Sequence, residues 1–175
     1  MDLTTMVTSM AQDLLALQTL AQTFAVGIGI LYCGGALQNA IRKSGSPGAD
    51  ISGQSIIVSF LIGALIVNFS GAMTNTIGSL GGGTTTYGTM ISYSGASAAG
   101  NFASAINAVL TIASTFGWWY ALKGWTMFRK AASGGGGGGY EDYAWKGFIH
   151  VLGGAMLVNI TGTLTAFQAT IGAST

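Results

Sequence analysis

The chain has 175 residues, and only 6% of them are charged, against roughly 25% in an ordinary soluble domain. Half of the residues are hydrophobic, and the mean hydropathy is +0.56. This composition disfavours a soluble enzyme, and a net charge of +1 disfavours sequence-specific nucleic-acid binding, which needs clustered cations. The single cysteine, Cys33, excludes an intramolecular disulfide framework. We therefore expect an integral membrane protein.

Four apolar stretches follow one another along the chain, at residues 14–41, 54–77, 102–128 and 147–171. Each can cross a membrane, because about 20 helical residues cover a hydrocarbon core of about 30 Å. The first stretch is the weakest, since Gln18 and Gln22 make its early turns amphipathic and suited to a membrane interface. The predicted fold class is an all-α integral membrane protein with four hydrophobic helices, arranged as two duplicated helical hairpins.

The basic residues fall into two clusters, each at the bend between two predicted helices. The first cluster is Arg42 and Lys43, and the second comprises Lys123, Arg129, Lys130 and Lys146. Short loops rich in Lys and Arg stay in the cytoplasm. Both bends are therefore predicted to face the cytoplasm, with both termini and the middle linker on the other side.

The two halves of the sequence read as copies of each other. Residues 63–71 are Gly-Ala-Leu-Ile-Val-Asn-Phe-Ser-Gly, and residues 154–162 are Gly-Ala-Met-Leu-Val-Asn-Ile-Thr-Gly. Upstream of each motif lie a basic pair and a Gly/Ser-containing loop. We predict a first hairpin over residues 1–79, a Gly/Thr/Ser linker over 80–100 and a second hairpin over 101–175. The uncharged linker is suited to packing against neighbouring subunits.

The repeated motif predicts helix packing. Helices in lipid associate through small residues and through polar side chains that bond across the interface. The glycines of each motif are eight residues apart, so they fall near one helix face. The predicted packing residues are Gly63, Asn68, Gly71, Gly154, Asn159 and Gly162. The alternative for Asn68 and Asn159 is a polar pore lining.

The sequence contains no recognisable catalytic, metal or cofactor motif, so we expect a non-enzymatic protein. The glycine runs lack the Lys-Ser/Thr ending of a phosphate-binding loop. His150 is the only histidine and has no second ligand beside it, which favours a structural role. Glu141 and Asp142 lie beside basic residues, as in a solvated charged face. No cofactor is expected, and phospholipid as a structural ligand is the alternative that the basic residues leave open.

This layout resembles the small hydrophobic inner-membrane components of type IVB secretion and I-type conjugation systems, a group that includes IcmC/DotE, IcmD/DotP and TraQ. The resemblance covers roughly residues 14–172 and rests on the motifs at 63–71 and 154–162. The chain is also similar in layout to conjugative pilins, which are short, apolar and helical with a basic loop between helices. It differs from them in having four predicted spans. The resemblance implies a bacterial envelope machine that moves DNA or protein between cells.

The resulting hypothesis is a self-assembling subunit of a conjugation or type IV secretion apparatus, located in the bacterial inner membrane and then in an extracellular pilus. Its expected partners are copies of itself, phospholipid and other secretion-system proteins. The expected lipid-facing or lumen-facing basic residues are Arg42, Lys43, Lys123, Arg129 and Lys130. The alternatives are a fixed inner-membrane channel component and a small transporter or holin-like pore.

Overall fold

The computed structural model describes residues 3–46, 51–83, 85, 87–133 and 140–172. Within these ranges all regular structure is helical and no strand occurs, which confirms the all-helical prediction. The helices are α1 (Leu3–Gly45), α2 (Gly53–Val67), α3 (Phe69–Ser79), the 3-10 helix η1 (Ser94–Phe102), α4 (Ala103–Ala132), α5 (Tyr140–Val158) and α6 (Ile160–Thr170).

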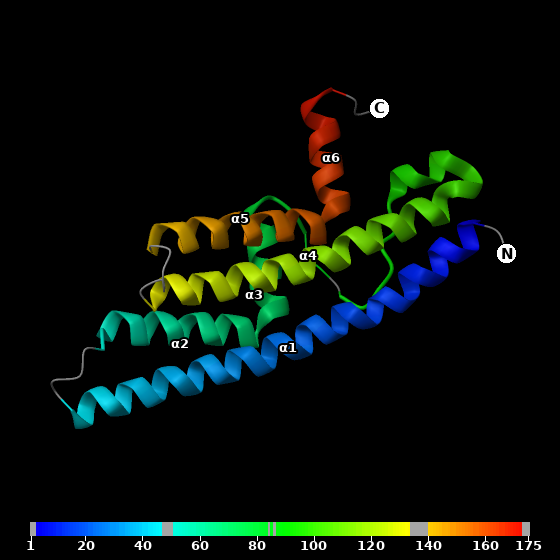
Figure 1. The fold of residues 1–175 in the computed structure, drawn as a ribbon. Helices are drawn as coiled ribbons and strands as arrows, with labels where there is room; N and C mark the ends of the chain where they lie inside the picture. The colour runs from blue at the N-terminus through cyan, green and yellow to red at the C-terminus, as the bar shows by residue number, and fades with distance from the viewer. Residues whose placement is uncertain (1–2, 47–50, 84, 86, 134–139, 173–175) are drawn as a thin grey trace.

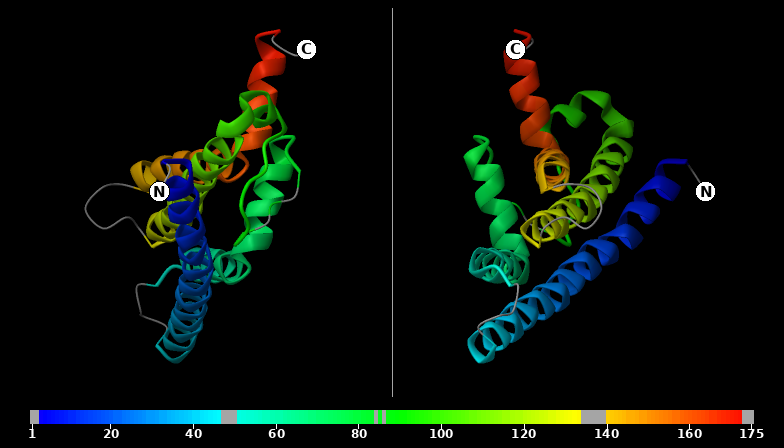
Figure 2. Two further views of the ribbon diagram at one scale, coloured as in Figure 1. Left: turned by 90° about the vertical axis from the view of Figure 1, so that its right-hand side faces the viewer. Right: turned by 60° about the vertical axis from the view of Figure 1, so that its left-hand side comes forward.

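Two helix pairs form the body of the molecule: α1 packs against α2, and α4 packs against α5. The pairs lie side by side, because α4 also packs against both α1 and α2. The carboxyl ends of α1 and α4 and the amino ends of α2 and α5 gather at one end of the bundle (Figure 1). The short helices α3 and α6 project from the body at a steep angle (Figures 1 and 2).

The helices define a membrane protein by their length and composition. The segments Thr4–Gly45 and Ser94–Ala132 are each long and apolar enough to cross a membrane. The number of candidate spans rises to four if each of two bent helix pairs counts as one span. The layout of four spans in two hairpins stays a prediction. At 43 residues, α1 is about 65 Å long, roughly twice the thickness of the hydrocarbon core.

Each bent pair breaks at the asparagine of the repeated motif. The axis turns by 94° between α2 and α3 and by 90° between α5 and α6. Asn68 has φ −96° and ψ 50°, and Asn159 has φ −99° and ψ 48°, so the two breaks have the same backbone geometry. The sequence predicted a continuous helix through each asparagine, and the structure differs here. Asparagine suits the break because its side chain competes with helical backbone hydrogen bonds.

The glycine that follows each asparagine by three residues is part of the same bend. A Cβ atom at Gly71 would lie 2.6 Å from Asn68 Nδ2, and one at Gly162 would lie 2.5 Å from Asn159 Nδ2. Real Cβ atoms do not approach other atoms this closely. The amide side chain therefore occupies the space that the missing Cβ leaves open, which explains the shared spacing of Asn and Gly in the two motifs.

Different interactions hold the two bends. Phe69, Met73 and Ile77 of α3 are almost completely buried, and burial of such side chains stabilises a structure by about 1.5–3 kcal/mol each. None of the residues of α6 is fully buried. The Thr163 hydroxyl donates a 3.0 Å hydrogen bond to the Met156 carbonyl across the break, and the Tyr93 hydroxyl of the linker donates one of 3.1 Å to Gln168 Oε1 of α6.

These differences predict that the α5–α6 bend straightens on mutation and that the α2–α3 bend does not. Leucine favours a helix over asparagine by only about 0.5 kcal/mol, which is less than the burial energy that fixes α3. We expect Asn159→Leu with Thr163→Ala to extend α5 into α6. In the first half the matched change is Asn68→Leu alone, because Ala72 already occupies the position that corresponds to Thr163. This change should leave α3 in place.

Electron-spin distances in detergent measure this outcome, with labels at cysteines replacing Phe148 and Phe167 and with Cys33 changed to alanine. A straight helix separates these two sites by about 28 Å and a right-angled one by about 20 Å, at 1.5 Å per residue. The corresponding sites in the first half are Ile57 and Thr76. An unchanged distance in the second half, or a longer one in the first, would contradict the prediction.

Glycines bring the paired helices into backbone contact at equivalent places. A Cβ at Gly29 would lie 2.6 Å from the Val67 nitrogen. In the second half, a Cβ at Gly117 would lie 2.8 Å from the nitrogen of Val158. Such contacts between small residues are the expected basis of helix association in lipid. The same closeness explains why α1 and α4 each carry glycine in the middle of an apolar helix.

The linker after α3 packs on the chain's own helices. Gln18 of α1 is 2% exposed, and its Oε1 accepts a 2.9 Å hydrogen bond from the Gly88 backbone N–H. Its Nε2 donates to the Thr115 hydroxyl of α4 at 2.9 Å. The backbone N–H groups of Ile91 and Tyr93 donate to side chains of α4. The described part of the linker is therefore attached to α1 and α4 by hydrogen bonds of its backbone.

Candidate functional site: a polar pocket at the basic end

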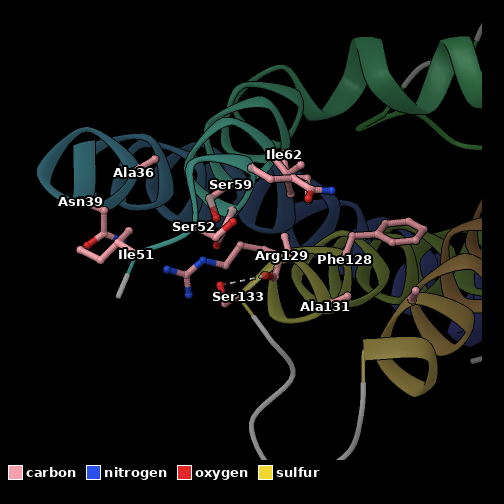
Figure 3. Close-up of a pocket in the computed structure, with 15 residues that line it drawn as sticks. Ala36, Asn39, Ile51, Ser52, Ser59, Ile62, Phe128, Arg129, Ala131 and Ser133 are labelled. Carbon is pink, nitrogen blue, oxygen red and sulfur yellow. Dashed lines mark hydrogen bonds between the residues drawn. The ribbon is translucent and has the colours of Figure 1, made fainter. Parts of the chain in front are cut away.

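A pocket of about 700 Å³ opens at the end of the bundle where the basic residues gather. Helices α1, α2 and α4 supply most of its wall (Figure 3). Its apolar floor includes Ile62 and Phe128. The polar residues of the wall are Asn39, Ser52, Gln54, Ser55, Ser59, Arg129 and Ser133. An apolar floor with a polar rim suits a ligand that has an apolar part and a polar head.

Arg129 is the only ionised side chain among the described lining residues. It extends from α4 toward Ser52 at the start of α2 (Figure 3). Its guanidinium carbon lies 4.4 Å from the ring centroid of Tyr32, which holds the group in place by a cation–π contact. In the described part of the chain, Arg129 Nε is buried without a hydrogen-bond partner. A ligand cannot reach this buried atom, so an anion in the pocket would meet the terminal nitrogens of the guanidinium, which extend toward Ser52 (Figure 3).

The start of α2 adds positive potential to the pocket. The first N–H groups of a helix have no intrahelical partner, and the helix dipole favours an anion there. Ser52, the residue before the helix, makes no capping hydrogen bond with its side chain. Lys43 lies nearby, since a Cβ at Gly53 would be 3.3 Å from its Nζ. A phosphate group matches this combination of guanidinium, ammonium and backbone donors.

The remaining predicted basic residues lie outside the pocket. Arg42 is exposed at the end of α1, and Lys123 is exposed on α4. Lys130 lies over the ring of Tyr143, 5.9 Å from its centroid. Lys43 also does not line the pocket, although its Nζ lies near Gly53 at the start of α2. Of the five predicted basic residues, the structure therefore places Arg129 alone in the pocket wall.

The predicted packing residues occupy two kinds of position. Gly63 and Gly154 are buried and touch the facing helix, as a Cβ at either would lie within 3.0 Å of backbone atoms there. Asn68 and Asn159 lie at the helix breaks, with Gly71 and Gly162 beneath their side chains. Asn68 is exposed and Asn159 is partly buried.

The acidic residues and the histidine have local partners. Glu141 and Asp142 lie in the first turn of α5, where a negative charge stabilises a helix. Asp142 pairs with Lys146 at 3.8 Å on the exposed surface. His150 Nδ1 lies 2.7 Å from the Lys146 carbonyl oxygen, and the imidazole stacks on Tyr120. Among the described residues, no cluster of His, Cys, Asp or Glu could hold a metal ion.

Two features of the site were missed at the level of sequence. The serines at the start of α2 belong to no known binding motif. The run of Ser and Gln at a helix start was the signal that could have indicated free backbone donors there. Gln18 was interpreted as part of an amphipathic surface, whereas it is buried between α1, α4 and the linker. Its two hydrogen-bond partners, Gly88 and Thr115, are 70 and 97 residues away along the chain, so no local pattern could reveal them.

Comparison with known proteins shows no match: no family model, no curated protein and no solved structure is similar to this chain.

Proposed function

We propose that this chain is a non-enzymatic membrane subunit that assembles with copies of itself in a bacterial conjugation or type IV secretion apparatus. The observation that carries the proposal is the large exposed apolar surface of the long helices. Leu31 is 73% exposed and Ile41 is 72% exposed, on the same helix that packs its other side into the core. In a single copy this surface needs lipid, and in an assembly it is available to other copies.

Pilus formation with bound phospholipid is the specific form of this function that we propose. The pocket around Arg129 suits a phospholipid, with the phosphate at the guanidinium and the start of α2 and an acyl chain along Ile62 and Phe128. The subunit would be stored in the inner membrane with its basic end toward the cytoplasm, in accordance with the distribution of Lys and Arg. Other proteins of the apparatus would be its further partners.

Two other functions remain as competing proposals. A fixed channel component of the same apparatus would use the same helix packing without leaving the membrane. A small transporter or holin-like pore would need a polar path, and the exposed Asn68 is the repeated polar residue best placed to face one. Solute flux through liposomes that contain the pure protein would favour the pore over the other two functions.

Shearing of the source cells tests the pilus proposal directly. We expect the intact chain in the pelleted extracellular fibres by mass spectrometry, together with phospholipid in the same pellet. A chain that stays wholly in the inner-membrane fraction would contradict the pilus and favour the fixed channel component. A chain recovered from the cytosol without detergent would contradict the membrane assignment itself.

A further inference from the structure

The helix contacts fix how the two halves of the chain correspond. Gly29 meets Val67 and Gly63 as Gly117 meets Val158 and Gly154, so α1 corresponds to α4 at an offset of 88 residues. The motifs place α2–α3 on α5–α6 at an offset of 91 residues. Residues 15–44 of α1 therefore have counterparts in α4, and the residues of α2 and α3 have counterparts in α5 and α6.

The halves pack on each other through two different faces. The inner α1 face consists of Ala21, Ala25, Ile28 and Tyr32. The inner α4 face consists of Trp118, Leu122, Trp125 and Arg129. Together they form much of the core, and Arg129 lies over the ring of Tyr32 at 4.4 Å. Helix α3 joins this contact through Phe69, whose ring is 5.5 Å from that of Trp118.

The counterpart of each inner face is exposed. The counterparts of the inner α1 face form the outer α4 face: Val109, Ala113, Phe116 and Tyr120. The counterparts of the inner α4 face form the outer α1 face: Ile30, Gly34, Leu37 and Ile41. Trp118 is 1% exposed, whereas its counterpart Ile30 is 59% exposed. Ala21 is fully buried, whereas its counterpart Val109 is 56% exposed.

The contact between the halves is therefore a heterologous contact that the chain uses once internally and leaves open at both ends. A heterologous contact repeated between identical units gives a ring if the rotation closes and a helical filament if it does not. We propose that copies of this chain assemble head to tail, with the outer α4 face of one copy on the outer α1 face of the next. This inference rests on the proposed self-assembly and specifies its geometry.

The chemistry of the outer faces supports this pairing. In the internal contact, the small residues Ala21 and Ala25 of α1 belong to the same buried cluster as Trp118 of α4. Between copies, Gly34 on α1 leaves room for Phe116 and Tyr120 on α4. A Cβ at Gly34 would meet no atom within 4 Å, so this glycine lacks a packing partner inside one copy.

Helix α6 completes the contact between copies as α3 completes the internal one. Ile160 is the counterpart of Phe69, and Ile30 is the counterpart of Trp118. The bend at Asn159 turns α6 off the axis of α5 with the same backbone geometry that turns α3 at Asn68. Ile160 of one copy then lies against Ile30 of the next copy, which explains why α6 has no fully buried residue in the single chain.

Cysteine cross-linking between two separately labelled variants tests this geometry. Both variants carry Cys33→Ala, because the residue that corresponds to Cys33 in the second half is Ala121 and alanine is therefore expected to fit at this position. One chain carries Ile30→Cys and the other Ile160→Cys, and a short bismaleimide is added to the mixed, membrane-embedded proteins. We expect a heterodimer band in the mixture and at least a tenfold weaker band for either variant alone. A chain that carries both cysteines should give a ladder of trimers and tetramers.

Leu31→Cys is the matched control, because Leu31 is one residue from Ile30 and 73% exposed, but its counterpart Trp119 packs on Phe24 and not on Phe69, the counterpart of Ile160. Mixed with Ile160→Cys, it should cross-link at least tenfold less. Strong cross-linking of either single variant with itself would overturn the head-to-tail geometry in favour of a two-fold contact. Uncross-linked oligomers on a native gel would overturn this inference while the self-assembly proposal stands. Single copies only, at every protein concentration, would overturn both.

Discussion

Replacing Gly154 with leucine should unfold the second helix pair, whereas the same change at the adjacent Gly153 should not. A Cβ at Gly154 would lie 2.7 Å from the Ala121 backbone nitrogen and 2.8 Å from the Gly117 carbonyl oxygen. These are backbone atoms of α4, so they cannot move aside without separating the helices. Overpacking of this kind costs about 1–3 kcal/mol, and a whole leucine side chain belongs at the upper end.

Gly153 provides the control because a Cβ there would meet no atom within 4 Å. Leucine favours a helix over glycine by about 0.8 kcal/mol, so Gly153→Leu should keep or raise the stability. Thermal unfolding of the detergent-solubilised proteins, followed by circular dichroism, measures both variants. Equal melting temperatures for Gly154→Leu and the unmodified chain would show that α4 and α5 do not pack at this distance.

Replacing Arg129 with glutamine should remove most of the affinity for an anionic phospholipid. Hydrogen bonds to a charged group contribute about 1.5–3 kcal/mol, and every 1.4 kcal/mol is a tenfold change in affinity. We therefore expect the affinity for phosphatidylglycerol to fall at least tenfold. Native mass spectrometry of the detergent-solubilised protein, titrated with the lipid, measures this change.

Lys123→Gln removes the same charge from an exposed position outside the pocket. An exposed charge contributes little binding energy, and in detergent there is no charged bilayer surface for Lys123 to bind. Its loss should therefore change the affinity for the lipid less than twofold. Inorganic phosphate serves as the second ligand. Phosphate that binds as well as the lipid would show that the apolar floor at Ile62 and Phe128 contributes nothing. Equal losses for both variants would place the lipid elsewhere.

The composition and the positions of the charged residues along the chain determined the broad class of this protein. Eleven charged side chains in 175 residues leave little choice other than long apolar helices. Their spacing located α4 to within a few residues, but α1 begins eleven residues before the predicted stretch and the second and fourth stretches are each broken at an asparagine. The repeated Gly-Ala-x-x-Val-Asn-x-x-Gly motif also predicted a shared structural role, because helix-face periodicity is a local property. The positions of Gly63 and Gly154 against the facing helices agree with that role, since small residues permit backbone contact.

Tertiary structure decided what local patterns do not encode. The apolar run through Asn68 reads as one helix, whereas the structure turns it by 94° at the asparagine and buries Phe69, Met73 and Ile77 beyond the turn. The pocket joins side chains from four helices, so no spacing along the chain could place Ser52 beside Arg129. The uncovered faces are a tertiary result too. Two nearly equal halves have unequal burial because each half has one neighbour inside the chain and offers its other face outside it.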